Sequence, residues 1–315
     1  VIACSSSKPE MLPVDSAPIC KEMSEEAWTE RVGDTLVKAA YSNCASVARQ
    51  LLADVGDIKK LKDAFRKAIN QNSADVAKVL IDHWQDTNEL SEIINKPLSV
   101  GAYDHPLHIA ARTRSTAWWE SLGEPDVLPD SSRGALEVAK LLIEHGADVN
   151  GKANSEEGER MVSYSQSKGG MTPLHALAMD RGDAVELAKL LIEKGANINA
   201  KWGGGGYTPL HEAVSCCFDM DHHGAHLGLT KLLINNGAAI NAKTEGYMWH
   251  GVTHTGGWTA LHNSVAAWQD TRKFDDSYRR KWAEEINANT KEIVKFLIAN
   301  GAAINAYSDN DSTPL

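Results

Sequence analysis

The sequence lacks several features that would assign it to a familiar functional class. It has no apolar run of about 18 residues, so no membrane-spanning helix is predicted. Acidic residues outnumber basic ones, 42 to 32, and the net charge of −10 argues against nucleic-acid binding, which requires dense lysine and arginine. No G-x-S-x-G motif, Walker-type phosphate loop, C-x-x-C or H-E-x-x-H motif occurs. We therefore predict neither an enzymatic activity nor a cofactor.

A short apolar block recurs along the chain and defines an internal repeat. The block reads AKLLI at 139–143 and 188–192, with variants at 48–52, 77–81, 230–234 and 294–298. Four blocks continue into a shared phrase: EHGADVNGK, EKGANINAK, NNGAAINAK and ANGAAINAY. A second phrase lies upstream of three blocks, as GGMTPLHALA, GGYTPLHEAV and GGWTALHNSV, and YDHPLHIAA is a degenerate fourth copy. The sequence closes with STPL, the opening of one more such phrase.

Each phrase has a physical explanation as part of a helix pair. Thr172 before Pro173 is typical of a helix N-cap followed by proline in the first turn, and apolar residues spaced three and four apart follow it. The glycine of the other phrase comes just after the second helix, where a left-handed C-cap favours it; these glycines are Gly146, Gly195, Gly237 and Gly301. The polar, Gly-rich connection to the next unit indicates a hairpin-like finger. Such units bury their apolar faces only when stacked.

These phrases resemble the ankyrin repeat, in which T-P-L-H-x-A precedes L-L-I-x-x-G-A-x-I-N-A. The resemblance implies an all-α ankyrin-repeat solenoid of stacked helix-turn-helix units with β-hairpin fingers and long insertions. We expect a tether at 1–22, atypical N-terminal capping repeats at 23–100, and ankyrin repeats at 101–315, the last incomplete. It also implies a structural role for four histidines, which we expect to hydrogen-bond neighbouring fingers: His108, His175, His211 and His262.

The repeats are longer than the family unit of about 33 residues, and the extra segments are rich in aromatic residues. The last four spacings between blocks are 62, 49, 42 and 64 residues. The surplus falls in helix–helix turns, including 268–290, and in fingers. Because tryptophan and tyrosine are enriched in interface hot spots, we predict that these residues bind a partner: Trp118, Trp119, Tyr164, Trp202, Tyr207, Tyr247, Met248, Trp249 and Trp258. For Trp118, Trp119, Trp268 and Trp282, small cores within the insertions are the alternative.

One insertion, CCFDMDHHGAH at 216–226, concentrates residue types that bind first-row metals. Its weak candidate ligands are Cys217, Asp221, His222 and His226. The spacing matches no recognised zinc pattern, and adjacent cysteines rarely ligate the same ion. We therefore expect a solvated or partly packed loop and no metal.

The first residues, VIAC, resemble a bacterial lipobox, which implies lipidation at Cys4 and loss of residues 1–3. The segment SSSKPEMLPVDSAP fits a disordered tether, and Ser5 favours the outer membrane by resemblance to enterobacterial sorting. The start of the signal peptide would then lie upstream of Val1. Cys20 and Cys44 could form a disulfide in an oxidising periplasm, and a buried thiol is the alternative for Cys44.

Taken together, the resemblances predict a protein-binding ankyrin scaffold, monomeric when free and lipid-anchored in the bacterial periplasm. The leading hypothesis is an immunity or inhibitor protein that covers one secreted toxin, such as a type VI phospholipase effector, because ankyrin-type lipoproteins occur beside such toxins. A periplasmic stress or assembly scaffold is one alternative. A host-directed ankyrin effector is another, and the lipobox argues against it.

Overall fold

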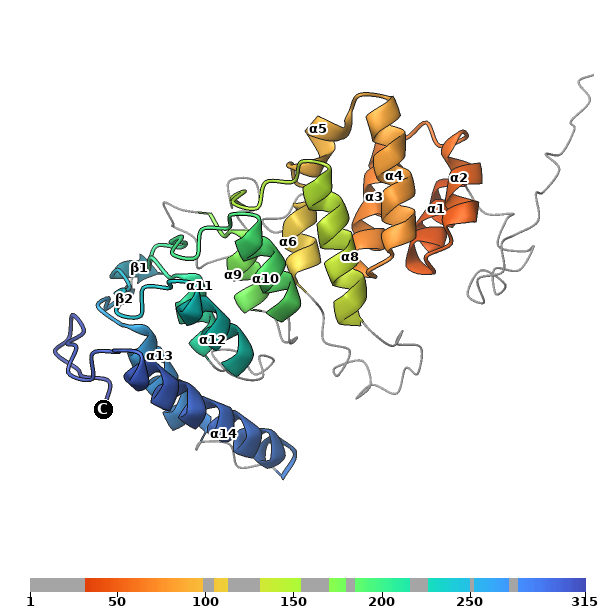
Figure 1. Ribbon diagram of the computed structural model, residues 1–315. Helices are drawn as coiled ribbons and strands as arrows, with labels where there is room; N and C mark the ends of the chain where they lie inside the picture. Colours follow the sequence, from red (N-terminus) through yellow and green to blue (C-terminus); the bar gives the residue numbers. More distant parts are fainter. Residues whose placement is uncertain are drawn as a thin grey trace, which may run out of the picture.

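The computed structural model describes residues 32–98, 105–112, 131–153, 170–179, 185–215, 226–249, 252–271 and 277–315. Side chains are described in these ranges except at 32–34, 131–133, 247–249, 252–254, 267–271 and 277–287. In this part of the chain, helices pack in two parallel rows that form an elongated stack (Figure 1). No described helix is both long and apolar enough to cross a bilayer.

Each repeat contributes one helix to each row. The inner row consists of α1 (Val32–Tyr41), α3 (Ile58–Asn70), α6 (Pro106–Ala111), α9 (Pro173–Ala178), α11 (Pro209–Val214) and α13 (Ala260–Thr271). The outer row consists of α2 (Ala45–Leu52), α4 (Ala74–Asp86), α8 (Ser131–Glu144), α10 (Val185–Glu193), α12 (Leu227–Asn235) and α14 (Ser277–Ala299). A short helix, α5 (Leu90–Ile94), follows α4. Every helix of a row contacts the next helix of that row, so one continuous core runs through the stack.

The predicted start and stop signals of the helices are confirmed. Thr172 is the N-cap of α9, with Pro173 in the first turn, and Thr208 holds the same place before α11. Gly146, Gly195 and Gly237 have φ values of 94°, 90° and 91°, in the left-handed region that ends a helix most easily at glycine.

The fingers are hairpin-like, also as predicted. Strands β1 (Tyr247–Trp249) and β2 (Val252–His254) pair antiparallel, with Met248 opposite Thr253. Isolated antiparallel bridges close two other fingers, between Ala153 and Met171 and between Trp202 and Tyr207. In three different connections between repeats, the two ends therefore pair antiparallel.

The insertion at 268–290 differs from its prediction as a helix–helix turn. α13 continues to Thr271 and α14 begins at Ser277, so most of this segment lengthens the two helices. The segment YRRKWAEEI is rich in arginine, lysine, alanine and glutamate, which have high helix propensity, and this explains the continuation.

The first two helix pairs are held by a large apolar core. Trp84 is fully buried and its ring meets Phe65 edge-on, with the ring centroids 5.0 Å apart. Cys44, at the start of α2, is fully buried, and its Sγ lies 3.7 Å from the carbonyl oxygen of Ser42. Cys20 lies outside the described residues.

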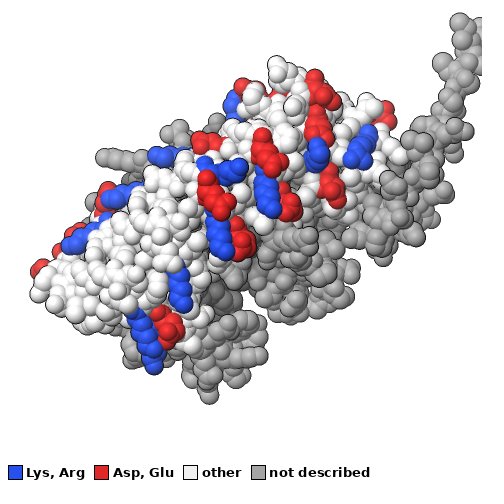
Figure 2. Space-filling view, viewed as in Figure 1, with Lys and Arg blue, Asp and Glu red and all other residues white. Residues whose placement is uncertain are grey.

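The outer helices carry acidic and basic side chains in adjacent pairs (Figure 2). Lys78 pairs with Asp82 on α4, and equivalent pairs three residues apart lie on α8, α10 and α14. All are well exposed, and each such pair contributes only about 0.3–0.5 kcal/mol. This arrangement is that of a solvated face.

Candidate protein-binding surface

Successive fingers are joined by a ladder of asparagine side chains. In each rung, Nδ2 donates to the carbonyl of the next repeat's C-cap glycine at 3.0–3.1 Å, and Oδ1 accepts from the backbone N–H two residues later at 2.7–2.8 Å. The rungs are Asn95, Asn150, Asn199 and Asn241. Each asparagine satisfies two backbone groups and fixes the spacing between neighbouring repeats.

A second ladder uses the four predicted histidines, and their expected bonds to neighbouring fingers are confirmed. Nε2 lies 2.8–3.2 Å from a backbone carbonyl oxygen of the following connection. In His175, His211 and His262, Nδ1 faces the backbone N–H and hydroxyl of the threonine three residues earlier. Because a backbone N–H can only donate, Nδ1 is the acceptor and Nε2 carries the proton.

Burial keeps these imidazoles neutral. It lowers the pKa of His108, His175 and His211 to about 4, although hydrogen bonds to carbonyl oxygens act in the opposite direction. Burial also lowers the pKa of His262. All four histidines are at most 4% exposed. The histidines therefore hold the fingers in place and are not available for chemistry at the surface.

The degenerate repeat shows what the threonine contributes. His105 occupies the threonine position before Pro106, and its ring lies 5.3 Å from that of His108. Within the described part of the chain, Nδ1 of His108 is buried without a hydrogen-bond partner. The other three histidines accept a hydrogen bond at Nδ1 from the threonine three residues earlier, and this repeat lacks that bond.

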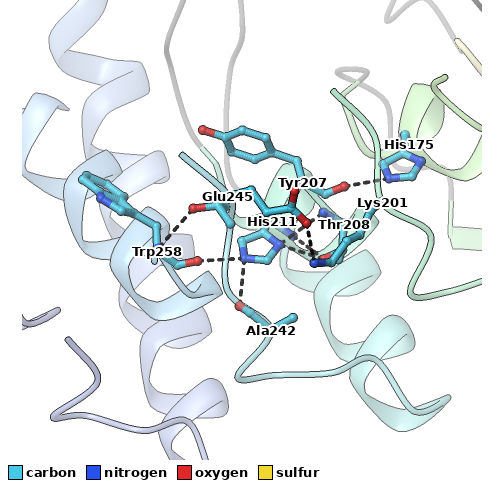
Figure 3. A network of polar contacts seen from close by, with 9 residues as sticks. His175, Lys201, Tyr207, Thr208, His211, Ala242, Glu245 and Trp258 are labelled. Carbon is cyan, nitrogen blue, oxygen red and sulfur yellow. Dashed lines mark hydrogen bonds and ion pairs between the residues drawn. The ribbon is translucent and has the colours of Figure 1, made fainter. Parts of the chain in front are cut away.

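Two fingers in the C-terminal half, one containing Lys201 and the other Glu245, are bonded directly to each other (Figure 3). Lys201 forms an ion pair with Glu245 at 3.0 Å, and the backbone N–H of Glu245 donates to the carbonyl of Gly205 at 2.7 Å. Gly206, with φ of 59°, lies against Glu245 so closely that a Cβ would meet Oε1 at 3.0 Å. Glycine at position 206 therefore permits the close approach of Glu245.

The second of these fingers is anchored again at its far side. The Thr244 backbone N–H donates to the carbonyl of Trp258 at 2.8 Å, and Lys243 Nζ donates to the carbonyl of Tyr307 at 2.7 Å. Asp309 also donates its backbone N–H to the carbonyl of Gly256 at 3.0 Å. The fingers from 201 onward therefore form one cross-linked edge.

Three of the predicted partner-binding aromatics lie on this edge with described side chains. Trp202 and Tyr207 face each other across the hairpin bridge, and both are partly exposed. The Tyr207 ring meets His211 edge-on, with the centroids 6.1 Å apart, and the Trp258 ring lies 5.9 Å from that of His262. The Trp202 ring likewise lies against that of His175, so each of the three aromatic rings packs against a histidine of the ladder.

Glu212 is a further residue of this edge for which the sequence patterns predict no role. It follows His211 on α11, is partly buried, and accepts a hydrogen bond from the indole Nε1 of Trp202 at 2.7 Å. Burial raises the pKa of its carboxyl to about 7, while the indole hydrogen bond acts to lower it. Glu212 occupies the variable position after the histidine of a TPLH phrase, which marks it as a candidate. The sequence does not show that this position lies beside Trp202.

The remaining predicted site residues fall into three groups. Residues outside the described part of the chain are Cys4, Trp118, Trp119, Tyr164, Cys217, Asp221 and His222. For Tyr247, Met248 and Trp249 the structure describes the backbone of β1. His226 is the N-cap of α12, and its backbone N–H donates to the carbonyl of Ala213 at 2.9 Å. Among described residues, no group of three His, Cys, Asp or Glu side chains could hold a metal ion.

The fold and the two ladders define a helix-pair solenoid whose repeats are joined through finger turns. The family model of ankyrin repeats in three copies matches residues 132–244, and the model of the single ankyrin repeat matches 103–154. Residues 103–244 therefore contain ankyrin repeats. Such repeats indicate a protein-binding scaffold, and proteins of this kind are typically non-enzymatic. The comparison with curated proteins found no match to the chain.

Proposed function

We propose that the protein is an inhibitor that binds one protein partner through the cross-linked edge formed by the fingers from Lys201 to Trp258. The observation that carries this proposal is the support beneath the aromatic residues. Trp202, Tyr207 and Trp258 are partly exposed, yet each belongs to a finger that is bonded to its neighbours. A pre-organised edge loses little conformational entropy on binding, so most of the interaction energy of aromatic contacts there contributes to the affinity for the partner.

The outer face of the stack is less suited to this role. Its charges already form exposed pairs with one another along α4, α8, α10 and α14. A partner would gain little from such pairs, because exposed ion pairs contribute little energy.

We further propose that the partner is a secreted toxin and that the protein acts as its immunity protein in the bacterial envelope, anchored by a lipid at Cys4. A type VI phospholipase effector is the most concrete case, covered at its active site. The lipobox-like VIAC segment, the net charge of −10 and the extended fingers support this proposal. Replacement of Cys4 with serine is expected to release the protein from membranes, and retention in the membrane fraction would show that Cys4 is not the anchor.

The central experiment is an affinity capture from detergent-solubilised envelopes of the organism that encodes the protein, followed by mass spectrometry. We expect one stoichiometric secreted enzyme, whose activity the purified protein inhibits. Trp258→Ala and Tyr207→Ala should each weaken binding by about 2 kcal/mol, roughly thirtyfold in Kd, as expected for hot-spot residues. Lys140→Ala on the outer face of α8 is the matched control and should bind like the wild type. A spread of envelope proteins at low occupancy, or an unaffected Trp258→Ala variant, would overturn the proposal.

A further inference from the structure

The residue after each ladder histidine forms a row along the inner helices. The row consists of Ile109, Ala176, Glu212 and Asn263. Ile109, Ala176 and Asn263 are 6%, 2% and 5% exposed, whereas Glu212 is partly exposed. Glu212 is thus the charged member of a row that is otherwise neutral and buried.

The carboxyl group of Glu212 is held at one oxygen and open at the other. Oε1 accepts the indole N–H of Trp202 at 2.7 Å, whereas Oε2 takes no hydrogen bond or ion pair from the described residues. Trp202 is fixed in turn by the backbone bridge to Tyr207 and by the edge of its ring against His175, with the centroids 6.3 Å apart. The carboxyl is therefore held in one orientation before any partner arrives.

No described cation balances this carboxyl. Lys201 lies on the same finger as Trp202, but its Nζ is paired with Glu245 at 3.0 Å. The raised pKa of Glu212 has burial as its main cause, and no described cation acts to lower it. A partly buried carboxyl without a cationic neighbour is costly to ionise, and a cation brought to it from outside would remove that cost.

We propose that Glu212 and Trp202 form an anchor site for one basic side chain, lysine or arginine, presented by the protein partner. This inference rests on the proposed function and names the chemistry that the partner must offer. The cation would contact Oε2 of Glu212 and lie beside the indole, whose π system also attracts cations. The negative net charge of the chain favours the approach of a basic segment.

The competing interpretation is that Glu212 only accepts the hydrogen bond of Trp202. Glu212→Gln separates the two roles, because an amide oxygen still accepts the indole N–H while the negative charge is lost. Glu186→Gln is the matched control: it removes one carboxylate from the outer face of α10, where Glu186 pairs with Lys189.

The test uses small probes on the full chain and reads the indole N–H signals by ¹⁵N–¹H NMR. Of nine tryptophan signals, the one lost in Trp202→Phe identifies Trp202. N-acetyl-lysine methylamide and N-acetyl-arginine methylamide are titrated separately, and N-acetyl-norleucine methylamide is the uncharged control. We expect a saturable shift of the Trp202 signal with at least one cationic probe, weakened about tenfold or more in Glu212→Gln and unchanged in Glu186→Gln.

Two results would overturn the anchor site: an equal response to the norleucine probe, or an unchanged cation response in Glu212→Gln. The Trp202 signal of Glu212→Gln without a probe shows whether the indole is still hydrogen-bonded, so a misfolded variant is recognised. The outcome is independent of the capture experiment. Capture of one partner without a probe response rejects the anchor site alone, whereas a probe response without a stoichiometric partner rejects the proposed function alone.

Discussion

The first two helix pairs and the four that follow have the same helix arrangement, but they are cross-linked at opposite rims of the stack. In the N-terminal pairs, Asn43 lies in the turn between α1 and α2 and bonds to the start of α4, through Asp75 at 2.9 Å and the backbone N–H of Val76 at 3.3 Å. From Asn95 onward, the asparagines bond at the fingers instead.

The cores of the two regions also differ. The N-terminal pairs bury Trp84 and Phe65 against each other, whereas the later inner helices bury a histidine in every repeat. The comparison shows that stacking requires only matching apolar faces, and that the polar motif adds a fixed geometry at the fingers. It also explains why the family model begins at residue 103, where the motif begins, and not where the helix pairs begin.

The largest difference between the two regions should appear on acidification. A histidine with a lowered pKa in the folded state binds fewer protons there than in the unfolded chain, so its stabilisation is complete above pH 6.5 and is lost as the pH falls toward 4. Near pH 4, each of His108, His175 and His211 should lower the free energy of unfolding by on the order of 3 kcal/mol. Glu212, with its pKa raised to about 7, acts in the opposite direction and offsets part of this loss.

Urea unfolding followed by circular dichroism at pH 7.5 and 4.5 measures this effect, and hydrogen exchange locates it. The repeats from α6 onward should lose protection first. His175→Asn, which cannot titrate, should flatten the pH dependence, and Glu212→Gln should steepen it by removing the offset. Earlier loss of protection in α1–α4 would contradict the assignment.

The next largest effect should arise in the N-terminal pairs. Trp84→Ala removes a fully buried ring that contacts Phe65, and we expect a loss of about 4 kcal/mol from the lost burial and the remaining cavity. Because solenoid repeats contact only their neighbours, hydrogen exchange should increase in α1–α4 and the adjacent α6 and α8. Protection at α12 should be unchanged, and equal deprotection there would show that the two regions unfold as one unit.

Features within one repeat could be predicted from the sequence, whereas contacts between distant segments could not. Caps, C-cap glycines and the histidine role follow from local motifs, because each depends on residues within one repeat. The partner of Asn150 at Gly195 lies 45 residues away, and the first rung, Asn95, has no motif around it. Contacts between repeats depend on how insertions place the fingers, and the contact of Glu212 with Trp202 depends on how one finger folds back onto the helix that follows it. Local spacing does not encode that placement.

A smaller effect tests the finger ladder by itself. Asn199→Ala removes one donor bond to Gly237 and one acceptor bond from Ala239, both at exposed positions, and should cost about 2 kcal/mol in urea unfolding. Asn199→Asp keeps the acceptor and should cost about half as much. Asn235→Ala, an exposed asparagine of α12 outside the ladder, is the control and should change little. Similar costs for Asn199→Ala and Asn235→Ala would indicate that the rungs add no stability.

The smallest effect is a gain, and it tests whether the threonine cap explains the difference between the degenerate repeat and the later ones. His105→Thr restores a threonine three residues before His108, whose Nδ1 is buried without a described partner. We expect a stabilisation of about 1 kcal/mol, seen as a higher urea midpoint with an unchanged m value. His105→Ala separates the new cap from the mere removal of the His105 ring, and it should remain below His105→Thr. If alanine stabilises as much as threonine, the capping bond to Nδ1 contributes nothing, and the close approach of the two rings is what weakens this repeat.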